Sequence, residues 1–540
     1  PCPQPPGGGD YSYFVYNDRL EIRHCVVEGQ SAGVNAIDLA FLSDVALDSS
    51  RLENNGRAFN LSNLQKATIR DNHFLNNTGG AVRLDIWNAQ DVVAVQRNTF
   101  TNNQSDYGGA VRLRGETSRP DFEANANADI AFNTFENNGA SVDGGAIYCS
   151  GRGTRSIQRN VFRGNTAQEH GGAVTVLDGG TTERNFFLNN TARLGGALYG
   201  GGSVEVNVFS GNHATERGGA LYGTQRYQAT TNTFYDNRAD DYGGALFSQY
   251  GTLFTSPREK SLILENIFWE NKRKVGGIYA SNVTGADVDK CTVCDAPYTM
   301  YNLFQIAESN YGSYIQNESN IDDALFYTNG FGNIFGFNPL FTNPQVLPGQ
   351  DGQLGTLDDG LRLQPGSAGI NTGAENYIFP LNSPFYDIRG ATRPQGNRKD
   401  MGAYEGACGT LAFVNLYNSR SASNNITICA SDNLVLGVTA NFAVSYQWKR
   451  NGVPVGTDSP TLFLNPVTTA DAGTYTVTIL GCTGGPITPD DIVVSVVPGQ
   501  PILYVNHQAA PGGNGTSWAT AFQHLQDALD VASRCTNVQE

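Results

Sequence analysis

The sequence is poor in the residues that mark charged, helix-rich or membrane-spanning proteins. Its 540 residues include only two Met and six His, and charged residues make up 16% of the total. No apolar run is long enough to cross a bilayer, and no segment of the first 280 residues combines helical length with a helical hydrophobic period. We therefore expect neither a membrane span nor a helical repeat, and the net charge of −16 disfavours nucleic acid and anionic membranes as partners.

What the sequence has in abundance is one phrase, N-x-F-x-x-N followed shortly by G-G-A, which recurs over the first 280 residues. Successive Phe residues are 22 to 35 positions apart, and the intervening segments are short, alternating and rich in Gly and Asn. This spacing predicts a solenoid of short parallel strands. The eight copies place their first Asn at Asn72, Asn98, Asn133, Asn160, Asn185, Asn207, Asn232 and Asn266, and their Phe at Phe74, Phe100, Phe135, Phe162, Phe187, Phe209, Phe234 and Phe268.

In a solenoid the same position of every copy stacks on its neighbours, so each column of residues should have one physical role. We expect the Phe column to form an internal aromatic stack. The Asn columns suit tight bends, because Asn tolerates left-handed backbone and its amide can bond to the copies above and below. The Gly pair suits a corner that a β-carbon would block. The residue after the G-G-A Ala, from Val82 to Tyr279, should face inward and the next one outward.

The F-x-x-N and G-G-A-[ILV] tetrapeptides resemble those of the polymorphic outer-membrane proteins of chlamydiae and of related bacterial surface β-helices. The resemblance covers about half of the chain and implies an all-β fold built on a right-handed parallel β-helix. It also implies export to the cell surface or beyond, because those relatives are adhesins and other surface proteins. A right-handed β-helix does not dictate function, since polysaccharide lyases and hydrolases share it.

Four parts of the chain are distinguished. We expect β-helix rungs over residues 1–300 and the final rungs with a C-terminal cap over residues 301–406, which resemble the closing part of secreted bacterial β-helices. Residues 407–499 resemble an immunoglobulin-like sandwich, and residues 500–540 resemble the opening strand and capping helix of a following β-helix module. The chain is expected to be one window of a longer modular protein.

The sandwich resemblance rests on Trp448 and on the D-x-G-x-Y corner that ends at Tyr475. The position two after this Tyr is Val477, so the usual inter-sheet cystine is absent. Cys429 and Cys482 flank the strands instead and are candidates for a disulfide near one end of the domain.

The other cysteines have simpler interpretations. Nine Cys is an odd number, which implies an unpaired thiol or a bond that leaves the chain. Cys291 and Cys294 are candidates for a small local disulfide, because a zinc site would need two further ligands that the sequence does not offer. Cys149 falls in an inward column and is interpreted as a small apolar filler.

One outward column is a candidate binding surface, because four of its eight members are aromatic: Tyr148, Tyr199, Tyr222 and Phe247. Exposed aromatic stripes bind sugar rings or partner surfaces. The alternative is that an inserted loop, such as residues 113–131 or 248–262, covers the stripe. A covered or self-associating surface is favoured over a glycan site.

An acidic loop is the candidate metal site. Asp351, Asp358 and Asp359 surround glycine turns, and such carboxylates supply the oxygen ligands that calcium requires. A solvated acidic turn explains the same residues equally well. A calcium ion here would brace the cap and would take no part in chemistry.

The favoured function is a non-catalytic structural or adhesive segment of a large secreted bacterial surface protein, whose partners are further copies, neighbouring modules, or a host or prey surface or glycan. A β-helix enzyme would need carboxylates that converge on one face of adjacent rungs. The aligned columns concentrate no acid, and His170 and His213 give no triad or metal signature. A polysaccharide lyase or hydrolase whose site is built from loops remains the first alternative, and a glycan-binding module the second.

Overall fold

A computed structural model of the protein shows a chain that separates into two compact units. One contains Pro1–Leu363, Thr372–Pro394 and Lys399–Gly406, and the other contains Gln364–Asn371, Gln395–Arg398 and Ala407–Glu540. The structure describes residues 12–14, 19–31, 33–40, 42, 44–64, 66–86, 92–115, 127–151, 153–249, 261–281, 288–290, 298–305, 333–364, 367–374, 385–396, 398–406, 411–420, 423–430, 432–441, 443–456, 459–481, 485–497 and 503–534.

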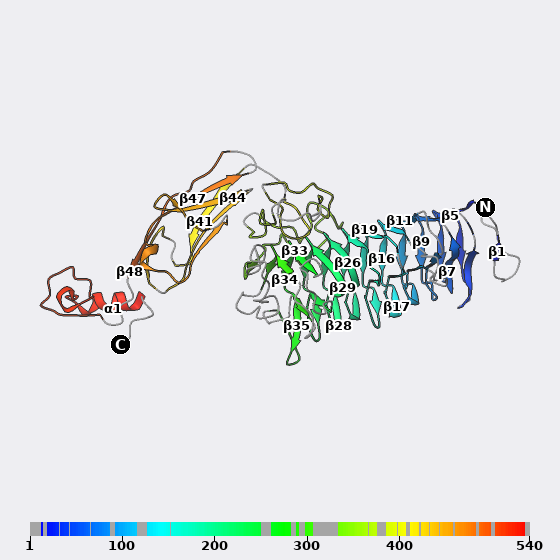
Figure 1. Ribbon diagram of the computed structural model, residues 1–540, viewed down its shortest axis with the longest axis horizontal. Helices are drawn as coiled ribbons and strands as arrows, with labels where there is room; N and C mark the ends of the chain where they lie inside the picture. The colour runs from blue at the N-terminus through cyan, green and yellow to red at the C-terminus, as the bar shows by residue number, and fades with distance from the viewer. Residues whose placement is uncertain are drawn as a thin grey trace, which may run out of the picture. The chain divides into compact units, whose positions relative to one another are not determined.

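The first unit is a parallel β-solenoid whose strands stack rung upon rung (Figure 1). Sheet A has twenty strands: β1 (Ser12–Phe14), β2 (Arg19–Arg23), β4 (Asn35–Ala40), β5 (Asp44–Asp48), β7 (Arg57–Leu64), β8 (Lys66–Arg70), β10 (Val82–Ile86), β11 (Val93–Gln96), β14 (Val111–Gly115), β15 (Ala128–Ala131), β18 (Ile147–Ser150), β19 (Arg155–Gln158), β22 (Val174–Val176), β23 (Thr181–Glu183), β26 (Leu198–Glu205), β29 (Leu221–Thr230), β32 (Leu246–Ser248), β33 (Leu262–Leu264), β37 (Val288–Lys290) and β38 (Tyr298–Met300). It consists of two parallel ladders that the long strands β26 and β29 join.

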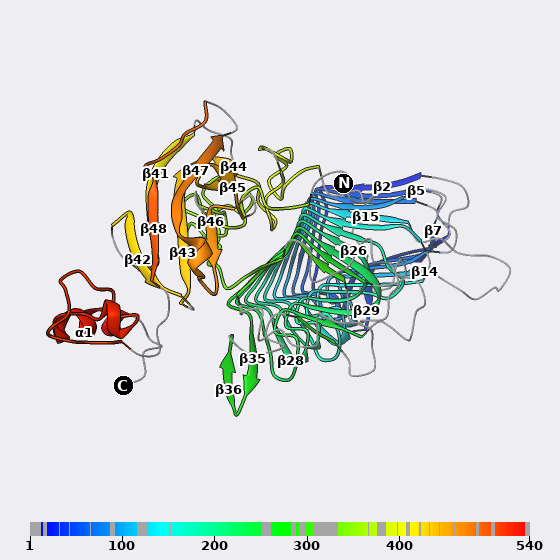
Figure 2. The same cartoon turned by 60° about the vertical axis from the view of Figure 1, so that its left-hand side comes forward.

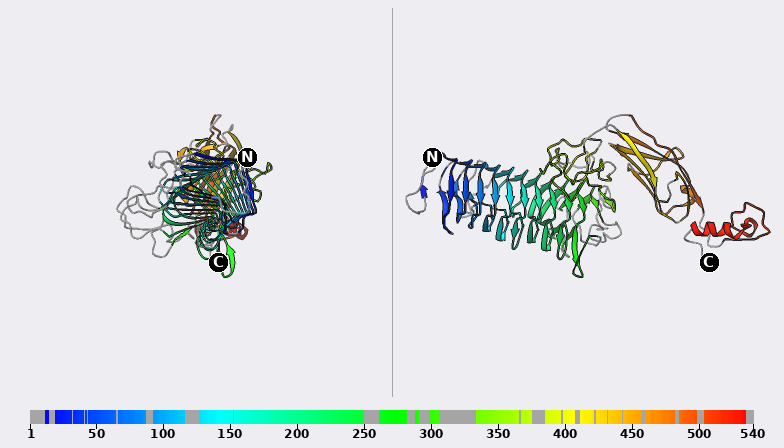
Figure 3. Two further views of the ribbon diagram at one scale, coloured as in Figure 1. Left: turned by 90° about the vertical axis from the view of Figure 1, so that its right-hand side faces the viewer. Right: turned by 180° about the vertical axis from the view of Figure 1, so that it is seen from behind.

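Two further sheets complete the solenoid. Sheet B has twelve strands: β3 (Val26–Glu28), β6 (Arg51–Glu53), β9 (His73–Leu75), β12 (Thr99–Thr101), β16 (Thr134–Glu136), β20 (Val161–Arg163), β24 (Phe186–Leu188), β27 (Val208–Ser210), β30 (Thr233–Tyr235), β34 (Ile267–Trp269), β39 (Leu303–Phe304) and β40 (Ile334–Phe335). Sheet C has eight: β13 (Gln104–Tyr107), β17 (Gly139–Asp143), β21 (Thr166–Ala167), β25 (Thr191–Leu194), β28 (His213–Arg217), β31 (Arg238–Ala239), β35 (Lys272–Val275) and β36 (Ile278–Ala280). Seen end-on, the rungs superpose (Figure 3).

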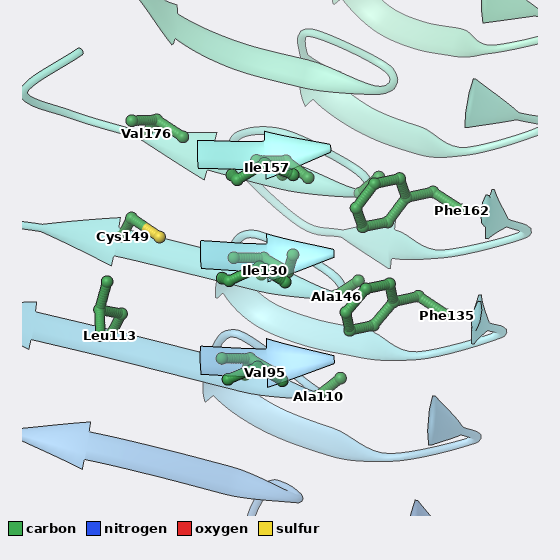
Figure 4. Packing of buried hydrophobic residues seen from close by; sticks show 14 of the residues in the cluster. Val95, Ala110, Leu113, Ile130, Phe135, Ala146, Cys149, Ile157, Phe162 and Val176 are labelled. Atoms are coloured by element: carbon green, nitrogen blue, oxygen red, sulfur yellow. The ribbon is translucent and has the colours of Figure 1, made fainter. Parts of the chain in front are cut away.

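The Phe column forms a continuous ring stack inside the solenoid. From Phe74 to Phe304, successive ring centroids lie 4.7 to 5.0 Å apart and the planes are within 8° of parallel. Phe335 adds one more ring at 5.5 Å. Each ring shares the interior with aliphatic side chains of sheet A, as Val95 and Ile130 do beside Phe135 (Figure 4). The stack extends past the eight complete copies because Asn302-Leu-Phe304 and Asn333-Ile-Phe335 keep the first half of the phrase.

The buried Asn side chains form hydrogen-bonded ladders along the solenoid. Asn185 is representative: its Nδ2 donates to Oδ1 of Asn207 at 3.0 Å and to the carbonyl oxygen of Ile157 at 2.8 Å. Its Oδ1 accepts from the backbone N–H of Asn160 at 2.9 Å and from the Asn160 Nδ2 at 3.0 Å. A buried amide must be satisfied in this way, because an unpaired one would destabilise the fold.

The left-handed bends differ from the expectation in one respect. The ladder Asn are not the left-handed residues; the residue immediately before each of them is, as at Arg97 with φ 55°, Val206 with φ 55° and Glu265 with φ 58°. The ladder amide must point along the column, so the bend falls on the preceding residue. At the second bend that preceding residue is often itself Asn, as at Asn76 and Asn102, which tolerates the conformation best.

The Gly pairs form the corners from sheet C to sheet A, as the sequence predicts. A β-carbon on Gly196 would lie 2.1 Å from the carbonyl oxygen of Gly219 on the next rung, so only Gly fits. The column that follows, from Val82 to Leu246, is buried. The eighth copy departs from this pattern: β35 and β36 form an antiparallel hairpin at the end of sheet C (Figure 2), and Tyr279 therefore does not face the solenoid interior.

The described part of the segment that was expected to cap the β-helix lies against the outer face of sheet B. The backbone N–H of Gly402 donates to the carbonyl oxygen of Glu265 at 2.7 Å, and that of Ala403 donates to Oγ1 of Thr233 at 3.0 Å. Tyr235 meets Phe341 edge-to-face at 5.8 Å. The described residues of 338–406 thus cover outward side chains of β30 and β34, because that face is apolar and would otherwise be exposed.

The second unit contains two small sheets that share one hydrophobic core. An antiparallel sheet contains β41 (Ala412–Asn418), β43 (Leu434–Asn441) and β46 (Thr461–Leu464), and a mixed sheet contains β42 (Asn425–Cys429), β48 (Ile492–Val497), β47 (Gly473–Gly481), β44 (Ala443–Arg450) and β45 (Val453–Pro454). Trp448 is fully buried, and its Nε1 donates to the carbonyl oxygen of Ser459 at 2.9 Å. The hydroxyl of Tyr475 donates to the carbonyl oxygen of Asp471 at 2.7 Å, which closes the corner before β47.

Short helical elements complete this unit: the 3-10 turns η4 (Thr469–Asp471) and η5 (Trp518–Thr520), and the helix α1 (Leu525–Arg534). Leu525 and Leu529 on α1 are 62% and 50% exposed. Among the residues that the structure describes, no helix is both long and apolar enough to cross a membrane.

Candidate functional site

The surface beside the Gly pairs, where sheet C returns to sheet A, is here called the outer corner. Two columns meet there: the residue just before each Gly pair, and the second residue after the G-G-A Ala of the next rung. The contacts are Tyr107 with Tyr148 at 5.0 Å, His170 with Tyr199 at 4.2 Å, and the Arg217 guanidinium with the Phe247 ring at 5.2 Å, all measured to ring centroids. Each rung thus covers part of the next.

The outward aromatic stripe is therefore largely covered. Tyr222 and Phe247 are only 3% and 2% exposed and cluster with Leu194, while Tyr148 and Tyr199 are half-buried. Tyr222 also donates its hydroxyl to Oε1 of Gln249 at 2.8 Å. These two residues fit the favoured alternative of a covered surface, and part of the cover comes from Leu194, which precedes the Gly pair of the preceding rung.

The proposed covering loops themselves lie mostly beyond the described part of the chain. Residues 116–126 of the loop 113–131 and residues 250–260 of the loop 248–262 are outside it. The cover that the structure shows comes from the neighbouring rung and from Gln249.

Charged side chains on sheet C pair from rung to rung. The Arg193 guanidinium bridges Glu169 at 2.7 Å and Glu216 at 2.5 Å, on the rungs before and after it. Nδ1 of His170 lies 2.7 Å from Oδ1 of Asp143 on the preceding rung. Individual exposed pairs contribute little to stability, but a ladder of them fixes the register of neighbouring strands.

Sequence reasoning missed one cluster of titratable side chains on sheet C. Nε2 of His213 lies 2.9 Å from Oδ1 of Asp240 and 3.1 Å from the hydroxyl of Tyr279, which also donates to Asp240. Nζ of Lys274 is 3.5 Å from Oδ2 of Asp240. The three elements β28, β35 and β36 bring these residues together with the turn after β31. The hairpin places Tyr279 here, and the repeat pattern gave no signal for it.

The environment of this cluster favours a charged Asp240. Burial would raise the pKa of Asp240, but the hydrogen bonds from His213 and Tyr279 outweigh that effect and lower it. Burial and the hydrogen bond to Asp240 raise the pKa of Tyr279 to about 12. Many acid–base catalytic sites contain a carboxylate that is hydrogen-bonded to a histidine and a tyrosine. It serves equally as a clamp between neighbouring rungs.

A groove of about 460 Å³ runs beside the first strands of sheet C. Its walls are polar and include Arg57, Gln104, Asp106 and Gln168, and no aromatic side chain lines it. Oγ of Ser141 donates to Oδ1 of Asp106 at 2.6 Å, so one wall is already bonded across rungs.

The acidic loop of the predicted calcium site uses its carboxylates as hydrogen-bond acceptors. Asp351 accepts from the N–H of Gln353 at 2.7 Å, and Asp358 accepts from the N–H of Asp351 at 3.0 Å. Asp359 is buried and accepts from the hydroxyl of Tyr404 at 2.8 Å; burial raises its pKa. In the described ranges no three His, Cys, Asp or Glu side chains form a group that could hold a metal ion. Calcium binding stays a prediction.

The cysteines divide into bonded and free. Cys429 is in a disulfide, while Cys482, Cys291 and Cys294 lie outside the described residues. Cys149 is a fully buried free thiol within the solenoid core (Figure 4), and burial raises its pKa to about 11. It fills space and is protected from reaction.

Comparisons with known proteins match the solenoid. Residues 8–127 match the family described as a right handed beta helix region. Residues 134–150 and 208–224 match the Chlamydia polymorphic membrane protein repeat, and each match spans one F-x-x-N and the following G-G-A. No curated protein matches the chain. The solenoid is therefore a right-handed β-helix region that carries polymorphic membrane protein repeats.

Proposed function

We propose that this chain is a non-catalytic, rod-forming segment of a secreted bacterial surface protein, with a structural or adhesive role. The observation that carries the proposal is the unbroken stacking of the solenoid: one column of Phe rings and two of Asn amides run through it. Such a body is stiff along its axis, because every rung is hydrogen-bonded and packed to the next. The repeats shared with chlamydial polymorphic membrane proteins support a place on the cell surface or outside the cell.

The second unit serves in this proposal as an immunoglobulin-like spacer. The fully buried Trp448 and the bond from the Tyr475 hydroxyl to the Asp471 carbonyl support this assignment, since both occur in such sandwiches. The half-exposed leucines of α1 support its assignment as the capping helix of a further β-helix module, which would cover them. Rods joined by spacers would reach far from the cell.

Electron microscopy of the purified chain tests the proposal. Rods of constant width that associate side by side or end to end would support it. The same preparation is incubated with a panel of neutral and acidic polysaccharides, and the release of new reducing ends is measured. Steady release of reducing ends by the purified chain would refute the non-catalytic part of the proposal.

A polysaccharide-cleaving enzyme is the second candidate, and the cluster of His213, Asp240 and Tyr279 is the observation that favours it. If polymer cleavage is found, His213→Gln and Tyr279→Phe should each abolish it while leaving the unfolding midpoint nearly unchanged. Arg193→Gln on the same sheet is the matched control and should leave cleavage intact. Cleavage that survives both substitutions would remove this cluster as the catalytic site.

A further inference from the structure

One patch on the outer face of sheet A carries an excess of positive charge, although the chain as a whole carries −16. Arg83 and Arg112 are register partners on the neighbouring strands β10 and β14, and Arg114 is the partner of Asp85 on the same two strands. Arg57, on β7, lies within electrostatic range of Arg83 and Arg112. These four side chains are here called the arginine row.

Few carboxylates balance the arginine row. Arg83 pairs with Asp85 through Nη2 and Oδ2 at 2.7 Å. Arg57 donates to the amide oxygen of Asn35 at 2.9 Å and to a backbone carbonyl, neither of which carries charge. Asp38 and Asp85 are the acidic groups that act on Arg57, and Asp143 acts on the adjoining Tyr148, so four guanidiniums face three carboxylates and leave an excess of one positive charge.

Arg112 is the least compensated member. It is half-buried, stacks over the Tyr107 ring at 5.5 Å, and its buried Nε has no hydrogen-bond partner. Among the described residues, neither Arg112 nor Arg114 has an ion pair with a carboxylate. Burial, followed by the charge of Arg83, lowers the pKa of Arg112. A partly desolvated cation without a counter-charge is unfavourable, and an anionic ligand would relieve it.

The surface beside the arginine row is aromatic. Tyr148 follows Arg112 in register on the next rung, and its ring lies 5.0 Å from that of Tyr107. Both rings are half-buried, so each keeps an accessible part. Tyrosine offers an apolar face and a hydroxyl, which together suit a sugar ring. Guanidinium groups bind planar or tetrahedral oxyanions through paired hydrogen bonds.

We propose that the arginine row and the adjoining Tyr107 and Tyr148 bind a linear acidic polysaccharide, with its carboxylate or sulfate groups on Arg112 and Arg114 and its sugar rings along the tyrosines. Arg83 and Arg112 lie along the stacking direction of the rungs, and Arg112 and Arg114 lie along one strand, so an extended polymer with several anions can contact all three. A folded acidic protein fits less well, because its carboxylates are dispersed over a surface and are not regularly spaced along one extended chain. The inference deepens the proposed function, on which it rests for the exported setting, by naming what the rod would hold.

The test measures binding of the full chain to immobilised polygalacturonate and to dextran sulfate, with dextran as the neutral polymer. Binding should weaken steeply as salt rises. Arg112→Gln with Arg114→Gln should raise the dissociation constant at least about tenfold, since each lost charged hydrogen bond is worth that much. Stronger binding to polygalacturonate would identify the anionic group as carboxylate, and stronger binding to dextran sulfate would identify it as sulfate.

The matched control removes the same two charges elsewhere. Arg97→Gln with Arg163→Gln breaks two exposed ion pairs, to Asp71 and to Glu136, on other parts of the solenoid. This control should bind within about twofold of the unsubstituted chain, because exposed pairs contribute little. If the Gln pair at the row destabilises the fold, Arg112→Lys with Arg114→Lys keeps the charge, removes the paired geometry and should still weaken binding severalfold.

Three results would overturn the proposal. They are no salt-sensitive retention on either acidic polymer, an equal loss in the control, and equal or stronger binding of polyglutamate or of anionic lipid vesicles. These failures are distinct from a failure of the proposed function, which the reducing-end assay and the electron micrographs decide. A chain that cuts polygalacturonate but needs the row to hold it would refute only the non-catalytic claim.

Discussion

Upstream of β24 the outward positions of sheet B are polar or at least partly exposed, whereas from β24 to β34 most of them are apolar and most are buried. In one register column Thr134 is exposed and Val161 is half-exposed, but Phe186 and Ile267, which follow on later rungs, are 6% and 1% exposed. The interior does not change along the same distance, since the Phe rings keep their spacing. The interior Phe and Asn columns determine the structure of each rung. The outward positions determine what each stretch of the solenoid contacts.

The covered stretch also differs in its charged groups. Arg393 and Glu405 are buried in the segment that covers sheet B, and their Nε and Oε2 atoms lie 3.0 Å apart. Lys399 is buried as well, and burial lowers its pKa. Buried ion pairs are weak sources of stability and are better suited to fixing one arrangement. The covering segment therefore docks in a defined position, whereas the uncovered stretch upstream leaves sheet B free for other contacts.

The largest loss of stability should come from substitutions in the Phe stack of the solenoid interior. It should be the same in the covered and the uncovered stretch of sheet B. Phe100→Ala and Phe187→Ala each remove a fully buried ring from the stack and should lower the free energy of unfolding by about 3 to 5 kcal/mol. Denaturant unfolding measures this loss. Phe132→Ala, at a side chain that is 51% exposed, is the control and should change stability by no more than about 0.5 kcal/mol. A markedly smaller loss at Phe187 would mean that the covering segment, and not the ladder, stabilises that stretch.

Substitutions at outward positions of sheet B should cause a smaller loss of stability, and this loss should differ between the covered and the uncovered stretch. Ile267→Ala removes side-chain atoms that lie against Gly402 of the covering segment and should cost about 2 kcal/mol, at the low end because Gly402 can shift inward. Thr134→Ala, in the same column of the uncovered stretch, should cost about 0.5 kcal/mol or less. Limited proteolysis followed by mass spectrometry should show faster cleavage within residues 338–406 only for the first variant. Equal cleavage in both would show that this contact does not hold the segment.

The interior of the fold was predictable because repetition turns one residue type into a physical column. The Phe position represented by Phe187 recurs with its two Asn neighbours in all eight copies. One sequence therefore gives eight independent indications of the role of that position. The outer contacts have no such redundancy. Phe186 lies beside Gly355, 169 residues later in the chain, and nothing periodic links the two.

The candidate sites were less predictable for the same reason. Tyr222 points outward, as period two predicts, and the sequence favoured a covered surface, but the cover includes Leu194 of the preceding rung, which was not among the expected covering loops. Tyr279 belongs to the last copy of the repeat, yet a hairpin replaces the expected corner and brings it to Asp240. Arg112 was visible in the outward column, but its lack of a carboxylate partner depends on distances that sequence does not contain.

The smallest effect concerns the clamp between His213 and Asp240, which holds sheet C together where the covered stretch ends. The pKa of Asp240 lies below its usual 3.8, so the folded state favours the charged carboxylate. This stabilisation is present above the unfolded pKa and is lost as the pH falls through the lower folded value.

Asp240→Asn should therefore lower stability by less than about 1 kcal/mol at pH 7, because the side chain is partly exposed. The difference between the variant and the unsubstituted chain in thermal unfolding should disappear once the pH falls well below 3.8. Asp71→Asn, which breaks the exposed pair with Arg97, controls for the loss of a surface ion pair. A difference for Asp240→Asn that stayed constant from pH 7 to pH 3 would show that the hydrogen bonds to Asp240, and not its charge, join these rungs.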